Sequence, residues 1–566
     1  MQLLDHVFVP PHTDTQANIA SQIIPINQDR KSNRALPSPI KPGKLNSYFV
    51  ALGYDPILSA QIIKGFQEGF TIGYFGIPNS CYDIDNSTSV NEHLSVVDDA
   101  VAKEVNAGRF IGPLTKLPFC TFQLNPLGVV PKKSGSFRLI TNLSSPKGSS
   151  INDFINDIFS AVKYSSIMDA IAILINLKPG SFLAKADVKS AFRLIPINPD
   201  QYHLLCYKWR GFFYIDTCLP MGARSSCQIF ELFSSSLEFV LNKLGVNFVV
   251  HYLDDFLFIH QERKGCVRAL ESFKFIADDI GLPLAPEKTV LPARSIEFLG
   301  YIIDTELEIV KLPPDKIEKG IILLKDLLSQ SFATLHELQC ISGFLNFACA
   351  VIVPGREFMN CFYCLMSKLR KPYHRVRLSV EIKRDMNLWL TFFSSFNGVS
   401  FYRNELFLSL EQVHVYTDAS KSVGFGAYTG SNWFFGAWPS DWYCNQNIVF
   451  LELIPVILAF LVWSPSFMNK VVVFHIDNEA LVAVVEKMRS KEPLVMNLIR
   501  QLVMKSMRKN ILVKAVHIEG SSNILADKLS RLQVQSFKNL HPMAEANPSV
   551  VPALPSEITS STVLLS

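Results

Sequence analysis

Two adjacent aspartates inside an apolar run constrain the fold of this chain more than any other feature. Asp254 and Asp255 lie between the apolar runs 248–250 and 256–259. A buried strand tolerates charge poorly, so a carboxylate pair in its middle needs a strong partner, for which a divalent metal ion is the natural candidate. At an exposed turn the same pair would be an ordinary solvated feature. Residues elsewhere in the chain must decide between these interpretations.

A third acid ends another largely apolar run. Residues 182–186 lead to Asp187, and small and polar residues follow. If the two runs are neighbouring strands, three carboxylates form a site for two hard cations, which prefer oxygen ligands and, as Mg²⁺, also bind phosphates and water. The alternative for either motif alone is an unrelated strand that carries an acid.

Four further acids accompany apolar elements near the C-terminus. Asp418 and Asp477 each follow a strand-like run, Glu452 lies in an apolar helical pattern, and Asp527 lies at a predicted helix start. An unpaired carboxylate in an apolar helix would be costly. A single one of these acids has an ordinary explanation as a surface residue.

Length and composition exclude several classes of protein. The 566 residues predict several domains, and 48% hydrophobic residues exclude a largely disordered chain. A net charge of +4 is too small to indicate nucleic-acid binding by itself. The 11 cysteines have no repeated spacing, which favours an intracellular, reducing compartment without deciding between cytoplasm and nucleus. We interpret Cys361 and Cys364 as helix packing and not as a zinc site.

The patterns along the chain predict an order of elements. Residues 128–142 resemble two short strands joined by a basic turn. Periodic leucines predict helices over 314–397, and strands and helices then alternate between 413 and 508 in a second α/β unit. The run 448–463 is shorter than a membrane span and contains Glu452, so we expect a buried helix and no membrane association.

In their order, these motifs resemble a reverse transcriptase followed by a ribonuclease H, over about residues 44–531. The resemblance implies an α+β and α/β architecture, in which a right-hand polymerase with fingers, palm and thumb precedes a ribonuclease H-like domain. Gly108–Pro113 and Val353–Arg356 further resemble the tyrosine-recombinase (DIRS-type) retrotransposons. The implied segments are a flexible extension (1–44), fingers and palm (45–310), a helical thumb or connection (311–400), the ribonuclease H-like domain (401–533) and a disordered tail (534–566).

The resemblance implies two metal-dependent sites. Asp187 and Asp254 would bridge two Mg²⁺ ions, with Asp255 supporting them, and Mn²⁺ could substitute. A second pair of Mg²⁺ ions would be held by four acids and would activate water against RNA: Asp418, Glu452, Asp477 and Asp527. The loop 519–522 lacks the histidine that longer family members carry there, and we interpret His517 as structural.

Several residues resemble the family's nucleotide-binding positions. Lys133 and Arg138 would hold the triphosphate, although a solvated turn explains this basic hairpin as well. Phe192 matches an aromatic gate that excludes a ribose 2′-hydroxyl, or else is an ordinary core aromatic. Met221 and Gly222 resemble a loop that shapes the pocket for the incoming base and the template.

Two further matches concern the leaving group and the primer. Lys288 matches a lysine that protonates pyrophosphate, with an exposed lysine as the alternative. Phe298–Tyr301 resembles a turn that positions the primer end. Residues 368–384 carry seven basic residues and one acid, which suits a track for a duplex backbone or, alternatively, a solvated helix face.

The predicted function is therefore an RNA- and DNA-directed DNA polymerase with ribonuclease H activity, which copies retroelement RNA and hydrolyses the RNA strand of the hybrid. Its partners would be an RNA template, a DNA primer, the RNA/DNA hybrid and deoxynucleoside triphosphates. A catalytically silent or co-opted nucleic-acid-binding remnant is the alternative. Phe192 and the nuclease motifs disfavour an RNA-directed RNA polymerase. The oligomeric state is open.

Overall fold

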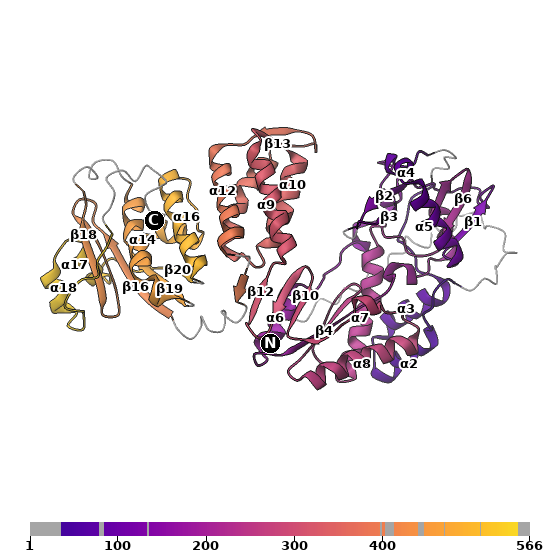
Figure 1. Ribbon diagram of the computed structural model, residues 1–566, viewed down its shortest axis with the longest axis horizontal. Coiled ribbons are helices and arrows are strands. Elements are labelled where there is room, and N and C mark those ends of the chain that lie inside the picture. Colours follow the sequence, from indigo (N-terminus) through magenta and orange to yellow (C-terminus); the bar gives the residue numbers. More distant parts are fainter. Residues whose placement is uncertain are drawn as a thin grey trace, which may run out of the picture. The chain divides into compact units, whose positions relative to one another are not determined.

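The described residues divide into two units. In the computed structural model these residues are 36–78, 84–132, 135–396, 399–401, 412–439, 447–468, 470–509 and 511–552. Unit 1 comprises Met1–Ala161 and Ser190–Phe230, and unit 2 comprises Val162–Lys189 and Glu231–Ser566. The division falls within helix α7 (Ser226–Lys243). Figure 1 labels the elements along the chain.

Unit 1 begins with two helices. Proline at the first helical position starts both α2 (Pro42–Leu52) and α3 (Pro56–Glu68), and the Asp55 carboxylate caps α3 by accepting from the backbone amides of Ile57 and Leu58 at 2.9 Å. Helix α2 starts inside the segment that we expected to be flexible (1–44), so that boundary is three residues too late. Residues 1–35 of this segment lie outside the described residues.

Two small β structures and two helices complete the main elements of unit 1. An antiparallel sheet has the order β1-β6-β5, and β2 pairs with β3 in the hairpin that the sequence predicts. Apolar side chains from β1, β2, β5 and β6 pack on one face of α5. The elements are α4 (Thr88–Glu92), α5 (Leu94–Asn106), β1 (Phe110–Leu114), β2 (Leu127–Pro131), β3 (Phe137–Thr141), β5 (Cys206–Trp209) and β6 (Phe212–Asp216).

The first part of unit 2 is a four-stranded antiparallel sheet with the order β7-β8-β4-β9. Helix α8 covers it with one apolar face, because Cys266, Leu270, Phe273 and Ile280 recur at helical spacing and are buried. The elements are α6 (Ile167–Ile175), β4 (Phe182–Asp187), β7 (Val249–Tyr252), β8 (Asp255–His260), α8 (Arg263–Ile280) and β9 (Val290–Ala293).

A second sheet and a helical bundle follow in unit 2. The sheet has the order β10-β11-β12-β15, and the predicted helices over 314–397 form as four α-helices, a 3₁₀ helix (Val353–Met359) and a π-helical turn (Phe392–Phe396). A two-stranded ribbon of β13 and β14 interrupts this helical region, which the sequence pattern did not predict. The elements are β10 (Ser295–Phe298), β11 (Tyr301–Asp304), β12 (Ile309–Lys311), α9 (Pro314–Ser329), β13 (Phe332–Thr334), α10 (Leu335–Ala348), α11 (Asn360–Met366), β14 (Arg375–Arg377), α12 (Val380–Thr391) and β15 (Val399–Phe401).

The last part of unit 2 is a five-stranded mixed sheet with the order β18-β17-β16-β19-β20. Strands β16, β17 and β18 are antiparallel, whereas β16, β19 and β20 are parallel. The elements are β16 (Gln412–Ala419), β17 (Gly424–Thr429), β18 (Asn432–Ala437), α14 (Ile448–Phe467), β19 (Val471–Ile476), α15 (Glu479–Glu486), α16 (Pro493–Arg508), β20 (Leu512–His517), α17 (Ile524–Ser530) and α18 (Val534–Leu540).

Helix α14 is apolar on nearly all sides and packs against this sheet and α16. Among the described residues it is the one helix long and apolar enough to cross a membrane, and 72% of that window is buried inside the fold. Burial of this kind explains why α14 has apolar side chains on all of its faces.

The expected disordered tail is wrong for residues 534–552. Helix α18 buries Phe537 against the Trp433 ring, with the ring centroids 5.1 Å apart. The Trp433 indole donates to the carbonyl of Glu545 at 2.8 Å, and the Trp463 indole donates to the Ser549 hydroxyl at 3.0 Å. Aromatic burial therefore orders a segment whose composition is typical of a disordered end. Residues 553–566 lie outside the described residues.

Candidate active sites

The three acids of the first predicted site lie at one end of the β4–β8 pair. Asp187 ends β4, Asp255 begins β8, and the two are directly opposite in the antiparallel register. Asp254 precedes Asp255 in the turn, and its carbonyl accepts from the amide of Val188 at 2.9 Å. Directly opposite residues share a face of a sheet. The fold therefore brings Asp187, Asp254 and Asp255 together, as the sequence predicts.

Their local structure differs from the predicted single strand. The apolar run forms two strands, β7 and β8, and the acids lie at the tight turn between them, where Tyr252 pairs with Asp255. Leu253 has a φ of 52°, a left-handed conformation that costs a branched residue about 1–3 kcal/mol. The carboxylates therefore project from a strained turn at the sheet's end and not from the middle of a strand.

Two lysines contact these carboxylates. The Lys288 ammonium lies 2.9 Å from both oxygens of Asp187, and the Lys185 ammonium lies 3.0 Å from Asp255 Oδ2. Burial, and then the charge of Asp187, raises the pKa of Asp254. Burial also raises the pKa of Asp255, against the effect of Lys185. Sequence reasoning missed Lys185, although its place two residues before Asp187 on the same strand puts both on one face.

The residues predicted to bind the nucleotide divide between the two units. In unit 1, Arg138 is exposed on β3, and its guanidinium lies 3.9 Å from the sulfur of Met221, which is 51% exposed. Phe192 packs beside Phe230 with ring centroids 5.4 Å apart. Lys133 lies outside the described residues, and Lys288 belongs to unit 2.

Gly222 is held close to β3 in unit 1. A Cβ at Gly222 would meet the carbonyl oxygen of Thr141 at 2.7 Å, so glycine allows a close backbone approach, as the sequence predicts. The Gly222 carbonyl accepts from the Asn152 side chain at 2.8 Å. Together with the Arg138–Met221 contact, these distances join the β2–β3 hairpin to the loop that carries Gly222.

The Phe298–Tyr301 segment in unit 2 forms the turn between β10 and β11. Leu299 and Gly300 both have positive φ values, of 50° and 80°, as a two-residue hairpin turn of the primed type requires. The Tyr301 ring stacks on Phe347 of α10 with centroids 4.4 Å apart. This packing fixes the turn that we interpreted as the primer-positioning element.

The four acids of the second site lie at one edge of the five-stranded sheet. Asp418 lies near the end of β16 and Asp477 directly after β19, and these neighbouring strands are parallel. Asp527 lies on α17, whose start is fixed by a 3.0 Å hydrogen bond from the Asn523 side chain to the carbonyl of Thr417. Glu452 lies on the buried helix α14.

Three of these acids, Asp418, Glu452 and Asp477, have a raised pKa to which other acids of the set contribute. Burial raises the pKa of Asp418 to about 6, and the charges of Asp477 and Asp527 add to that shift. Burial raises the pKa of Glu452 to about 7, with contributions from Asp477 and Asp418. Burial and the charge of Asp527 also raise the pKa of Asp477. A cluster of like charges with raised pKa values has the electrostatics of a cation site.

Sequence reasoning missed one cation beside this second cluster. Arg531 donates from Nε to Asp527 at 2.6 Å. It lies four residues after Asp527, so helical spacing was the available signal.

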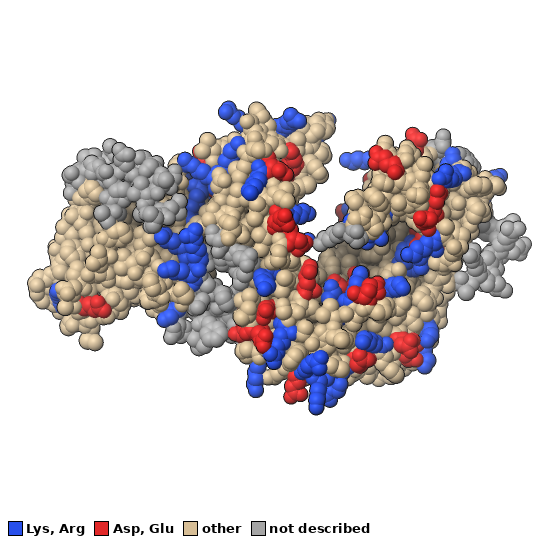
Figure 2. Space-filling model, viewed as in Figure 1, with Lys and Arg blue, Asp and Glu red and all other residues tan. Residues whose placement is uncertain are grey.

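The basic run 368–384 does not form one helix face. It spans the residues after α11, strand β14 and the first turn of α12. Figure 2 shows Lys and Arg side chains exposed at the end of the bundle where β13 lies. The exposed members of the run are Lys368, Arg370, Lys371, Arg375, Arg377 and Arg384, whereas Lys383 is half-buried and donates to the carbonyl of Leu328.

A family model matches the segment that contains the first site. Residues 130–303, which include Asp187, Asp254 and Asp255, match the family described as "Reverse transcriptase (RNA-dependent DNA polymerase)". This segment is similar to the reverse transcriptase family. It is related to the Pol polyproteins of retroviruses and retrotransposons.

Three curated relatives illustrate the relation of the reverse transcriptase segment. The Pro-Pol polyprotein of Simian foamy virus type 1 is 26% identical over 248 residues, which cover 43% of this chain and 19% of that protein. The Pro-Pol polyprotein of Feline foamy virus is 26% identical over 251 residues, 44% of this chain and 20% of that protein. The Pol polyprotein from transposon gypsy of Drosophila melanogaster is 25% identical over 146 residues, 26% of this chain and 14% of that protein. The match therefore spans a fifth or less of these relatives.

Two solved structures resemble this chain. The foamy viral protease-reverse transcriptase dRH in complex with double-stranded DNA has a TM-score of 0.47 and 16% identity, over 86% of this chain and 84% of that one. The foamy viral protease-reverse transcriptase in complex with an RNA/DNA hybrid has a TM-score of 0.44 and 15% identity, over 91% of this chain and 65% of that one.

The reverse transcriptase family, whose model matches the segment of the first site, generally uses divalent metal ions. As they stand, no three His, Cys, Asp or Glu side chains of the described ranges form a ready metal-binding group. At the first site a cation already bridges both Asp187 oxygens, namely the Lys288 ammonium. Asp255 Oδ1 and Glu452 Oε2 are buried and accept no hydrogen bond, so each site has an oxygen that lacks a partner. Hard cations prefer such oxygen donors.

Proposed function

We propose that the chain is an RNA- and DNA-directed DNA polymerase that uses Asp187, Asp254 and Asp255 to hold two Mg²⁺ ions. The arrangement of these three acids at one turn, inside a segment of the reverse transcriptase family, carries the proposal. When bound, the two ions would lower the pKa of the primer 3′-hydroxyl and neutralise charge on the triphosphate. Mn²⁺ would serve as a substitute.

The chain's own residues would bind and orient the reactants. Lys288 has a raised pKa because Asp187 accepts its hydrogen bonds, so it carries a proton at neutral pH. A protonated lysine released from Asp187 would be able to pass that proton to the leaving pyrophosphate. Arg138 would bind triphosphate oxygens, and Phe192 would exclude ribonucleotides by contact with their 2′-hydroxyl. By the same resemblance, Lys133 would also bind the triphosphate. Met221 and Gly222 would shape the pocket for the incoming base and the template.

We further propose that the C-terminal part hydrolyses the RNA strand of an RNA/DNA hybrid. The mixed sheet order β18-β17-β16-β19-β20 and the coupled acids Asp418, Glu452, Asp477 and Asp527 support this activity. A second pair of Mg²⁺ ions on these acids would activate water against a phosphodiester. Holding these two cations would be the chemical role of the four carboxylates.

The nucleic-acid partners follow from these activities. They would be an RNA template, a DNA primer, the RNA/DNA hybrid and deoxynucleoside triphosphates, and the exposed cations between Lys368 and Arg384 would contact the duplex backbone. We propose an intracellular location, which the nine free cysteines of the described residues support. Assignment to the DIRS-type class rests on Gly108–Pro113 and Val353–Arg356 alone and stays a proposal.

One doubly labelled substrate tests both activities. A labelled DNA primer is annealed to an RNA template that carries a different label, and the protein is added with deoxynucleotides and Mg²⁺. Asp254→Asn should stop primer extension and leave RNA cleavage intact, whereas Asp477→Asn should do the reverse. Primer extension that persists in Asp254→Asn would refute the polymerase site. RNA cleavage that persists in Asp477→Asn would refute the nuclease site. Binding of the substrate without either activity in the wild-type chain would favour the catalytically silent alternative.

A further inference from the structure

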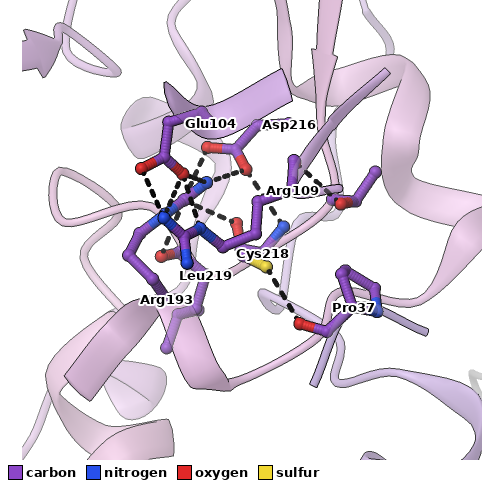
Figure 3. A network of polar contacts seen from close by, with 8 residues as sticks. Pro37, Glu104, Arg109, Arg193, Asp216, Cys218 and Leu219 are labelled. Atoms are coloured by element: carbon purple, nitrogen blue, oxygen red, sulfur yellow. Dashed lines mark hydrogen bonds and ion pairs between the residues drawn. The ribbon is translucent and has the colours of Figure 1, made fainter. Parts of the chain in front are cut away.

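Unit 1 contains a buried cluster of four charged side chains that the proposed chemistry does not use. The Arg193 guanidinium lies between the carboxylates of Glu104 and Asp216 (Figure 3). It donates to the two Asp216 oxygens at 2.7 and 2.8 Å and to Glu104 Oε2 at 2.9 and 3.1 Å. Arg109 donates to both Glu104 oxygens at 2.8 Å. Two arginines thus neutralise two carboxylates.

The side chains of this cluster are largely buried. The side chains of Arg193, Glu104 and Asp216 are 13%, 19% and 3% exposed. Burial alone would lower the pKa of Arg193, but the charge and hydrogen bonds of Asp216 together with the charge of Glu104 outweigh it and raise the pKa, so the guanidinium stays charged. Buried ion pairs contribute little net stability compared with apolar residues, and their best-attested use is to fix one arrangement of the chain.

The cluster joins two segments of the proposed nucleotide pocket. Arg193 follows Phe192 within the short 3₁₀ turn Ala191–Leu194, and Asp216 ends β6, shortly before the loop that carries Met221. Arg193 also donates to the carbonyls of Cys218 and Leu219 at 3.4 Å.

Asp216 continues the link into the loop, because it accepts from the amide of Cys218 at 3.0 Å. The backbone connects the same segments only briefly, where Ile197 donates to Thr217 and Leu219 donates to Ile195, each at 2.9 Å. The side chain of Arg193 therefore adds contacts to a short backbone ladder.

We propose that Arg193 is a positioning residue that fixes the spacing between Phe192 and the Met221 loop and thereby sets the discrimination between deoxyribonucleotides and ribonucleotides. This inference rests on the proposed polymerase function. Phe192 would exclude a 2′-hydroxyl only if its ring is held rigidly, since a misplacement of about 1 Å near the reacting groups can change a rate by about a hundredfold. The planar guanidinium can hold Asp216 with two parallel hydrogen bonds and reach Glu104 at the same time. A lysine ammonium has no such fork.

The test compares two weakened clusters with an exposed arginine pair. Arg193→Lys keeps the charge and loses the fork, and Glu104→Gln keeps Asp216 paired while it weakens the opposite side. Arg210→Lys is the matched control, because Arg210 makes a similar two-pronged contact with Asp98 at 2.7 and 2.9 Å but is about half exposed. The kcat and KM for a deoxynucleotide and for the matching ribonucleotide are measured for each variant. Thermal unfolding and cleavage of an RNA/DNA hybrid are measured alongside.

Arg193→Lys should lower the preference for the deoxynucleotide by roughly tenfold, chiefly through the two KM values, while hybrid cleavage stays unchanged. Glu104→Gln should act in the same direction with a smaller effect, and it decides the matter if Arg193→Lys does not fold. Arg210→Lys should match the wild type. An unchanged sugar preference in folded Arg193→Lys would overturn the inference. If only Glu104→Gln folds, an unchanged preference in that variant would do the same. Either result would leave the polymerase assignment intact. A wild-type chain that extends no primer would instead contradict the proposed function.

Discussion

Asp187 and Asp255 stand directly opposite each other on β4 and β8, and each carboxylate is paired with a different lysine. Lys288 takes both oxygens of Asp187, whereas Lys185 leaves Asp255 Oδ1 without a partner. Two neighbouring carboxylates repel each other unless cations neutralise them. The lysines therefore occupy positions in which they would compete with divalent metal ions.

Replacing Lys288 by Gln should tighten divalent-cation binding at the first site. The variant removes a competing ammonium and makes the local charge more negative, so the affinity for Mn²⁺ should rise by roughly tenfold. Titration followed by electron paramagnetic resonance measures it without turnover. Lys274→Gln removes an exposed lysine that pairs with Glu271 at 2.9 Å and should leave the affinity unchanged. Equal affinities for Lys288→Gln and the wild type would contradict the competition.

Gly222→Ala should damage unit 1, because the new methyl group would approach the backbone oxygen of Thr141 to 2.7 Å. Overpacking of this kind costs about 1–3 kcal/mol and should displace the Met221 loop, which lowers primer extension. Gly43→Ala on α2 is the matched control, since a Cβ there meets nothing within 4 Å. Thermal unfolding and extension rates report the two effects. A Gly222→Ala protein as stable and active as Gly43→Ala would disprove the close approach.

The stability of unit 2 should depend on pH through His251. Its ring lies between Glu231, at 3.0 Å, and Glu238. Burial alone would lower the pKa of His251, but the hydrogen bonds and charges of these two glutamates together outweigh it and raise the pKa from 6.5 to about 9. A raised histidine pKa stabilises the fold fully below pH 6.5, and this stabilisation is lost as the pH rises through 9.

Chemical denaturation between pH 6 and pH 10 measures this dependence. The free energy of unfolding of the wild type should fall by at most about 3 kcal/mol across the window. His251→Gln cannot gain the proton, so its profile should be flatter over the same range. Parallel profiles for the two proteins would show that His251 carries no such charge.

Phe537→Ala should destabilise the C-terminal part of the chain. Phe537 is fully buried beside Trp433, and truncation of a buried Phe typically costs about 3–5 kcal/mol. Phe275→Ala removes the same group from a side chain that is 70% exposed and should cost little. Thermal unfolding of both variants provides the comparison, and an unaltered transition for Phe537→Ala would argue against a packed α18.

The positions of the acids could be predicted because each accompanies an apolar element. Asp187, Asp254 and Asp477 all lie at strand ends, where the side-chain pattern changes visibly along the sequence. The contact between Lys288 and Asp187 could not be predicted in the same way. Lys288 reaches Asp187 across 101 residues, and its contact depends on tertiary packing that no local pattern records.

Other features escaped prediction for equally physical reasons. Strands β13 and β14 have three residues each, which is too short for an alternating pattern to emerge within a helical region. The segment after Gln533 has the composition of a disordered end, yet tertiary contacts of Phe537 order it. The Arg193 cluster unites residues from three separate stretches, and each charge viewed alone resembles a surface residue.

Incorporation of a single deoxynucleotide on an RNA template in the presence of Mg²⁺ tests the central claim most directly. The wild-type chain and Asp326→Asn, which changes an exposed aspartate on α9, should extend the primer at equal rates. Asp254→Asn should extend none of it, while its thermal unfolding and hybrid cleavage match the wild type. Equal incorporation by Asp254→Asn and the wild-type chain would contradict the account.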